Sequence, residues 1–127
     1  KINQIMKSII KLMNKYEDYE VSMEEIHHLH KLDKPSGTAI TLANKIIDKI
    51  DRKKNWSILN KNKDTVFIKD IREGSVSGTH IIKYNSTIDD IEIMHKAHNR
   101  KGFAQGAIIA AEFLKDKKGI YTMNDII

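Results

Sequence analysis

Three of the six histidines of this 127-residue chain lie in one short segment, His27–Ala39, with the sequence HHLHKLDKPSGTA. An imidazole exchanges a proton near neutral pH, and the lysine of the segment adds a fixed positive charge. The Pro-Ser-Gly-Thr stretch has the residue types of a helix start, where free backbone N–H groups and the helix dipole favour an anion. The segment therefore predicts a site for a small anionic molecule, such as a carboxylate.

The spacing of the segment places a condition on that site. His27 and Lys31 would lie about 13 Å apart in a fully extended chain, which one small substrate could hardly bridge. We therefore expect the chain to leave strand geometry after His28, so that the imidazole and the ammonium group face one pocket above the helix start. Gly37 would let a ligand approach the main chain closely.

Two other interpretations of the segment remain. Pro-Ser-Gly-Thr is often a plain helix cap without a ligand. A metal site is the second alternative, because His27, His28 and His30 are close in sequence. Adjacent histidines on a strand point to opposite faces, no HExxH helix is present, and Lys31 would repel a cation. We therefore predict no metal, and we expect His30 to be packed or exposed without a role.

Apolar residues at three- and four-residue spacing predict three helices that could position the site. The first covers Ile2–Met13, and the second follows the start signals at Pro35–Thr38. The third lies between Gly102 and Gly119 and is followed by a polar tail. The apolar stripe of the second helix is Ala39, Leu42, Ala43, Ile46, Ile47 and Ile50, and that of the third is Phe103, Ala107, Ala110, Ala111 and Leu114.

The remaining apolar runs predict strands. Tyr19–His28 alternates between apolar and polar residues and would deliver the histidines. Val66–Ile71, His80–Tyr84 and Ile88–Met94 are short, β-branched and bounded by Gly or Asn-Ser turns. Asp51–Asp64 is rich in Lys and Asn, and we expect an exposed connection there. Together these elements predict the α+β class, a small mixed β-sheet with flanking helices.

Composition excludes several classes of function. The absence of cysteine excludes disulfides and thiolate chemistry and fits a cytoplasmic protein. The net charge of +5 comes mainly from lysines interleaved with acidic residues, and aromatic residues make up only 6% of the chain, so we predict no nucleic-acid partner. No apolar stretch of about 18 residues is present, which predicts a soluble chain without a membrane partner.

The motif at residues 25–39, EIHHLHKLDKPSGTA, resembles the E-x-HH-x-x-K-x-D-x-PSGTA signature of dihydrodipicolinate reductases, also called 4-hydroxy-tetrahydrodipicolinate reductases. The resemblance continues at Arg72–Gly74 and Gly78–His80. Residues 91–107, IEIMHKAHNRKGFAQGA, are similar to the H-x-A-x-x-R-x-x-F-A-x-G-A segment of the family. Lys34 is a departure, since the family more often has Ala before Pro-Ser-Gly-Thr.

This resemblance implies one domain of a two-domain enzyme. Residues 1–101 would be the substrate-binding and oligomerisation domain of a homotetramer, and residues 102–127 would form a C-terminal helix and tail that pack on a dinucleotide-binding domain. That Rossmann domain is absent from this chain, which has no G-x-x-G-x-x-G turn and begins at Lys1 rather than Met. We therefore expect a fragment that is inactive by itself.

The resemblance also implies an activity, the reduction of 4-hydroxy-tetrahydrodipicolinate to tetrahydrodipicolinate with NADPH or NADH, in lysine and diaminopimelate biosynthesis. His27 would be the catalytic proton donor and Lys31 its catalytic partner. Arg100 and Phe103 would approach the cofactor, although Phe103 could equally be plain core. The substrate's carboxylates would be bound by His28, Lys31, Ser36, Gly37 and Thr38.

Two alternative functions stay open from the sequence. The chain could be a non-catalytic assembly or binding domain that keeps the fold without a cofactor. It could also belong to a related dehydrogenase that acts on another imino dicarboxylate, because anion binding at a helix start does not define the ring of the substrate.

Overall fold

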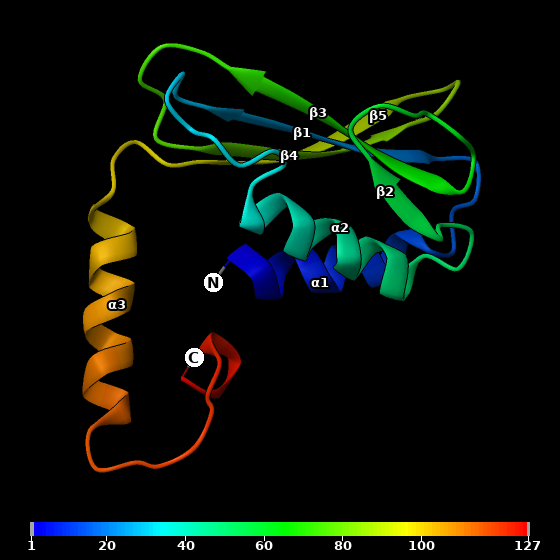
Figure 1. The fold of residues 1–127 in the computed structure, drawn as a ribbon. Helices are drawn as coiled ribbons and strands as arrows, with labels where there is room; N and C mark the ends of the chain where they lie inside the picture. Colours follow the sequence, from blue (N-terminus) through cyan, green and yellow to red (C-terminus); the bar gives the residue numbers. More distant parts are fainter. Residues whose placement is uncertain (1, 127) are drawn as a thin grey trace.

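The computed structural model describes residues 2–126, and the side chains from residue 5 to residue 126. One mixed sheet has two helices against one face, while a third helix stands apart from it (Figure 1). The elements in chain order are α1 (Ile2–Met13), β1 (Glu20–His27), α2 (Gly37–Lys49), β2 (Asn55–Ser57), β3 (Thr65–Arg72), β4 (Thr79–Asn85), β5 (Asp90–Lys96), α3 (Lys101–Leu114) and the 3₁₀ helix η1 (Met123–Asp125).

Strand β1 occupies the middle of the sheet, whose order is β2-β3-β1-β4-β5. It runs parallel to β3 and antiparallel to β4, and β5 pairs with the far side of β4. The register sets His27 beside Arg72 and Ile26 beside Thr79. The last residues of β1 therefore lie between the end of β3 and the start of β4, which confirms the expected α+β class and positions the candidate site.

The core lies between the sheet and the two helices that cover one of its faces, α1 and α2 (Figure 1). Helix α2 buries its predicted apolar stripe, with Ile47 only partly buried. Helix α1 buries Met6, Ile10 and Met13 of its stripe, whereas Ile5 is exposed. Alternate residues of β1 are buried, and the first two of these, Val21 and Met23, are ordinary core residues. The same alternation buries Glu25 and His27, so the strand carries polar groups into the helix-covered side at its end.

Two sequence-based boundaries were wrong. The predicted connection Asp51–Asp64 contains the edge strand β2, which is parallel to β3 and has only three residues, too few to show a periodicity. The predicted strand start at Ile88 lies in a turn instead, because Ser86 Oγ accepts hydrogen bonds from the amides of Ile88 and Asp89, 3.1 and 3.0 Å long. Strand β5 begins after this turn.

Helix α3 forms as predicted but buries none of its residues against the rest of residues 2–126. Its exposed large apolar residues are Phe103, Ile108, Ile109 and Leu114. The interpretation of Phe103 as core therefore fails, since 58% of the residue is exposed. No helix among residues 2–126 is both long and apolar enough to cross a membrane.

Lys53 was not singled out from the sequence, yet its side chain is completely buried beside β3. The ammonium group donates to the carbonyl oxygens of Lys63 (2.8 Å) and Thr65 (3.1 Å) and pairs with the carboxylate of Glu20. A buried charge is tolerated only when it is paired and hydrogen-bonded, and these three acceptors satisfy all three N–H groups of the lysine. Lys53 therefore ties the loop before β3 to the start of β1.

We expect Lys53→Ala to lower the free energy of unfolding by about 2–4 kcal/mol, because it removes charged hydrogen bonds and leaves a cavity. Urea unfolding followed by circular dichroism measures the change. Lys54→Ala, at the exposed neighbouring position, is the control and should change stability by less than about 0.5 kcal/mol. Equal stability of the two variants would contradict the structural role of Lys53.

Candidate active site

The chain bends at the end of β1, as the spacing of the histidines and lysine predicts. The strand ends at His27. The amide of Leu29 then donates to the carbonyl of Gly74 (3.1 Å), and the amide of Lys31 donates to the carbonyl of His28 (3.2 Å). The departure from strand geometry after His28 is therefore confirmed, and we call residues 28–36 the corner.

Arg72, the last residue of β3, holds the corner from one side. Its guanidinium donates to the carbonyl oxygens of Asp33 (2.7 Å) and Lys31 (3.3 Å) and also pairs with the carboxylate of Asp70. Only 8% of the Arg72 side chain is exposed, so these bonds are largely shielded from water. A planar group with several fixed donors suits this bridging role better than a lysine would.

Ser36 joins the corner to helix α2. Its hydroxyl oxygen accepts a hydrogen bond from the amide of Ala39 (3.1 Å), which is the bond of an N-cap residue. Its own amide donates to Oε1 of Glu25 on β1 (2.9 Å). The first amides of a helix have no partner within the helix, so those of Gly37 and Thr38, which are both exposed, are available to a ligand.

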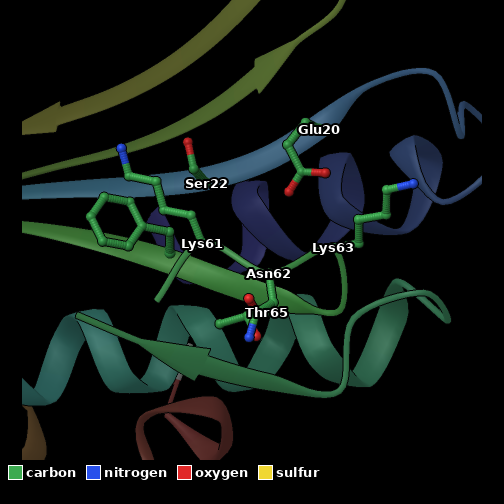
Figure 2. A pocket seen from close by; sticks show the side chains of 7 residues that line it. Glu20, Ser22, Lys61, Asn62, Lys63 and Thr65 are labelled. Atoms are coloured by element: carbon green, nitrogen blue, oxygen red, sulfur yellow. The ribbon is translucent and has the colours of Figure 1, made fainter. Parts of the chain in front are cut away.

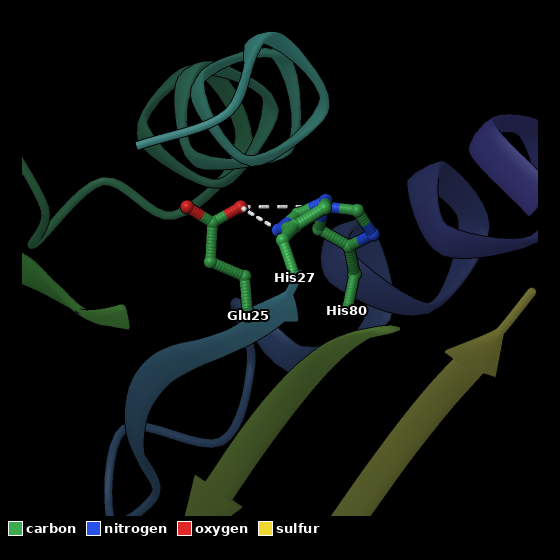
Figure 3. A group of neighbouring side chains, drawn as sticks. All are labelled: Glu25, His27 and His80. Carbon is green, nitrogen blue, oxygen red and sulfur yellow. Dashed lines mark ion pairs between the residues drawn. The ribbon is translucent and has the colours of Figure 1, made fainter. Parts of the chain in front are cut away.

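Three buried side chains meet beneath this helix start: Glu25 and His27 from β1 and His80 from β4 (Figure 3). Glu25 Oε2 lies 3.5 Å from Nδ1 of His27 and 3.4 Å from Nε2 of His80. The two imidazole rings meet edge to face with their centroids 5.0 Å apart. The hydroxyl of Ser36 lies 3.1 Å from the same His80 nitrogen, which links the cluster to α2.

The carboxyl of Glu25 is held in its ionised form. Burial alone raises the pKa of Glu25, but the His80 ring 3.4 Å away, the hydroxyl and the amide of Ser36 and the charge of His27 together outweigh burial and lower that pKa well below its usual range. Glu25 therefore carries a negative charge throughout the pH range in which an imidazole titrates.

The imidazole of His27 responds to opposing influences. Burial lowers its pKa, the charge of Glu25 raises it, and the positive charges of His80, Lys31 and Arg72 lower it further, so that the pKa of His27 lies below its ordinary value. The carboxylate is thus the one group among these that favours the protonated imidazole.

Two other chemistries fit this cluster less well. Ligand atoms of Glu25, His27 and His80 lie within 4.8 Å of one another, a spacing that could hold a metal ion. The nearby charges of Lys31 and Arg72 oppose a cation, so the prediction of no metal stays our interpretation. A nucleophilic serine relay is excluded, because the Ser36 hydroxyl and the carboxylate contact the same His80 nitrogen.

The family model described as "Dihydrodipicolinate reductase, C-terminus" matches residues 2–127. The chain belongs to this family. Two similar relatives are the 4-hydroxy-tetrahydrodipicolinate reductases of Christiangramia forsetii, 49% identical over 124 residues, and of Clostridium novyi, 39% identical over 132 residues. These matches cover 98% and 99% of this chain but only 52% of each relative. The chain therefore spans about half the length of the curated relatives it matches.

A similar solved structure is the dipicolinate-bound dihydrodipicolinate reductase from Paenisporosarcina sp. TG-14. The TM-score is 0.67 at 24% sequence identity, and the match covers 97% of this chain and 50% of that chain. At this identity the likeness supports the fold of a C-terminal dihydrodipicolinate reductase domain, and the site must be argued from the residues themselves.

In this reductase domain the residues His28, His30, Lys31 and Lys34 are more exposed than His27. Lys31 forms an ion pair with Asp33, with Nζ 2.8 Å from Oδ1, and keeps 21% of its side chain exposed. His28 is half-buried, and its ring lies 6.5 Å from that of the exposed His30. Lys34, the departure from the family pattern, pairs with Asp70 at 3.3 Å and is half exposed.

The two residues predicted for the cofactor lie at the start of α3. Arg100 precedes the helix and Phe103 lies in its first turn, and both are exposed. The amide of Ala97 donates to the carbonyl of Gly78 (2.9 Å), so the chain leaves the sheet beside the start of β4. Both residues thus follow the end of the sheet that carries the candidate site.

Sequence analysis gave no individual role to Glu25, Gly78 or His80, although all three lie within the quoted motifs. Gly78 has φ +143°, and a Cβ atom there would lie 3.3 Å from Nε2 of His27. A glycine therefore suits both the backbone and the space beside the imidazole. The available signal for Glu25 was its two-residue spacing from His27, which places both side chains on one face of a strand.

A separate hollow lies at the other end of β1 (Figure 2). Its lining residues are Glu20, Ser22, Lys61, Asn62, Lys63, Thr65 and Phe67, none of which was predicted for the site. Glu20 and His27 are the first and last residues of β1, so the hollow and the buried cluster are about 23 Å apart along the strand. The hollow is therefore separate from the candidate site at the corner.

The lowered pKa of His27 predicts a pH dependence of stability. The unfolded chain binds a proton at this imidazole at a higher pH than the folded chain does, so stability is complete above about pH 6.5 and falls as the pH drops below it. Glu25 acts in the same direction at lower pH, because its pKa is also lowered on folding. Urea unfolding between pH 8 and pH 5 measures the slope.

His27→Gln should flatten that slope between pH 6.5 and 5, where one imidazole contributes up to about 1.4 kcal/mol per pH unit. His30→Gln, at an exposed position, is the control and should keep the slope of the wild-type chain. If the His27→Gln slope equals that of the control, the burial of a neutral His27 is incorrect.

Proposed function

We propose that this chain is the substrate-binding part of a 4-hydroxy-tetrahydrodipicolinate reductase of lysine and diaminopimelate biosynthesis. The longer protein would use NADPH or NADH to form tetrahydrodipicolinate. The observation that carries the proposal is the corner, which contains Lys31, together with its two ends: the buried His27 of β1 and the exposed start of α2. Relatives that match nearly the whole chain and carry this enzyme name support it.

Carboxylate binding would orient the substrate. The amides of Gly37 and Thr38 would donate hydrogen bonds to one carboxylate at the positive end of α2, with the hydroxyl of Thr38 as a further donor. His28 and Lys31 would contact the substrate's carboxylates from the corner, while Ser36, which is buried, shapes the turn rather than exposing its own hydroxyl. The related reductase described as dipicolinate-bound binds a planar dicarboxylate, which is in keeping with such a site.

His27 would supply the proton. Loss of the 4-hydroxyl group as water would give the unsaturated dihydrodipicolinate ring. A reduced nicotinamide, when bound, would supply the hydride to an unsaturated ring carbon, which would leave electron density on the ring. The protonated imidazole of His27 would donate its Nε2 proton to the substrate ring, and the ammonium group of Lys31 would stabilise the negative charge that develops there. For this role Lys31 would exchange Asp33 for the substrate, because both anions compete for one ammonium group.

The dinucleotide would be held mainly outside this chain, which has no glycine-rich pyrophosphate turn. Arg100 and Phe103 fit a contact with it, because they are exposed and follow the end of the sheet that carries the corner. The proposed boundary between residues 1–101 and residues 102–127 is in keeping with an enzyme in which a second domain binds the dinucleotide. Helix α3 buries no residue within the described part of the chain, and its apolar side would pack on the dinucleotide-binding domain.

A cytoplasmic homotetramer is the assembly that we propose for the longer protein. Both α1 and α2 lie against one face of the sheet, and no other described element covers the opposite face (Figure 1). That face includes Phe67 on β3 and Met94 on β5, and 56% of Met94 is exposed. Apolar residues on an open sheet face suit contact with another subunit.

Binding of pyridine-2,6-dicarboxylate to the chain tests the carboxylate site by calorimetry. His28→Ala and Thr38→Val should each weaken binding about tenfold or more, because each removes a donor to a charged group. Thr87→Val, in the exposed turn before β5, is a matched control and should bind like the wild-type chain. Equal affinity in all four proteins would show that the site has been misplaced.

Turnover tests the reductase itself in the full-length protein. His27→Gln and Lys31→Met should each lower kcat about 10²–10⁴-fold with 4-hydroxy-tetrahydrodipicolinate and NADPH or NADH. The wild-type rate should fall as the pH rises through the pKa of the proton donor. His30→Gln is the control and should keep the wild-type rate. Full activity of His27→Gln would exclude it as the proton donor, and absence of wild-type turnover on this substrate would favour another imino dicarboxylate or a non-catalytic role.

A further inference from the structure

Glu25 occupies a position that an apolar residue would normally fill. It is fully buried on the helix-covered face of β1, in the same alternating row as Val21 and Met23. Burying a carboxylate costs several kcal/mol unless the charge is paired and hydrogen-bonded. Glu25 lies two residues before His27, so the side chains of both residues point to the same face of β1.

One oxygen of this carboxylate has a structural partner and the other does not. Oε1 accepts the hydrogen bond from the amide of Ser36 at the start of α2. Among the described residues, Oε2 of Glu25 and Nδ1 of His27 are both buried without a hydrogen-bond partner, and they lie 3.5 Å apart. An approach of a few tenths of an ångström would satisfy an acceptor and a donor that now lack partners.

The opposite edge of the imidazole faces a glycine rather than a side chain. Nε2 of His27 lies against Gly78, where a Cβ atom would approach it to 3.3 Å. A side chain at this position would press on the nitrogen, whereas glycine leaves space beside it. The ring thus has one nitrogen directed at a carboxylate and the other at a glycine.

We propose that Glu25 is the positioning residue for His27: its Oε2 accepts a hydrogen bond from Nδ1–H, fixes the ring orientation and tautomer, and leaves Nε2 to face the substrate. The negative charge also favours the imidazolium ion that donates the proton, against the burial of the ring and the positive charges of Lys31, Arg72 and His80. This inference rests on the proposed role of His27 as the proton donor.

His80 provides the competing explanation for Glu25. Its Nε2 lies 3.4 Å from the same carboxylate oxygen, so Glu25 could serve only to join β1, β4 and α2. The Ser36 hydroxyl gives His80 a partner of its own at 3.1 Å, whereas Nδ1 of His27 has none among the described residues. This difference favours His27 as the group that depends on Glu25.

The first test is the protonation of His27 in the wild-type chain, read by ¹⁵N NMR of the imidazole nitrogens. We expect the neutral ring to carry its proton on Nδ1. A neutral ring with its proton on Nε2 would overturn the proposal. This measurement needs neither a variant nor turnover, so it separates the positioning role from the reductase proposal.

The second test is Glu25→Gln, which retains an oxygen for the Ser36 amide and removes only the charge. The NMR titration midpoint of His27 should fall by about one pH unit or more. Glu25→Asp, which keeps the charge, should lie closer to wild type. Glu24→Gln is the matched control: it is the same substitution one residue away, on the opposite face, where Glu24 pairs with Lys83 at 3.1 Å. Equal midpoints in Glu25→Gln and Glu24→Gln would contradict the inference.

In the full-length protein, Glu25→Gln should lower kcat about tenfold at pH values above the midpoint and move the kcat profile to lower pH, with a smaller effect on KM. A loss of equal size at every pH, with an unmoved profile, would mean that Glu25 acts only on the fold. If His27→Gln is fully active while the NMR results are as expected, the proton-donor role fails and the Glu25–His27 bond stands.

Discussion

The buried carboxylate of Glu25 connects the end of β1 to the start of α2, and the geometry of the corner depends on that connection. One oxygen receives the amide of Ser36, and the other faces the imidazoles of His27 and His80. A charge in this position must be satisfied by surrounding donors or it would destabilise the fold. The requirement to satisfy it brings a strand end, a helix start and the proposed acid together.

Arg72 and Gly78 complete the arrangement from the neighbouring strands. Arg72 holds the carbonyl groups of the corner, and Gly78 leaves room beside the imidazole of His27. These contacts place positive charges near a buried histidine, which disfavours its protonated form. The carboxylate of Glu25 offsets that effect. The proposed proton donor can therefore lie close to the positive charges that would attract an anionic substrate.

Much of this architecture follows from the sequence because local signals agree with the tertiary fold. The apolar stripes of α1 and α2 predict buried helices, and the start signals before α2 predict its cap at Ser36. The bend after His28 follows from a distance argument, since an extended strand would separate His27 from Lys31. These features depend on short stretches of chain, where periodicity and capping preferences are informative.

Other features depend on residues that are distant in sequence. Edge strand β2 is too short to show a period, and buried Lys53 looks like one more surface lysine until its acceptors at Lys63 and Thr65 are known. The role inferred for Glu25 requires His80, 55 residues further along the chain, and the register that brings β4 beside β1. The exposed side of α3 has no partner among residues 2–126, so its packing cannot be read from this chain.

The central claim is that the corner binds a dicarboxylate at the start of α2 beside His27. Two-dimensional NMR of the isotope-labelled chain, titrated with pyridine-2,6-dicarboxylate, examines it residue by residue. We expect the largest amide shifts at Gly37 and Thr38, accompanied by a change in the ring signals of His27. Shifts confined to the hollow around Lys61 and Lys63, with none at the start of α2, would contradict it.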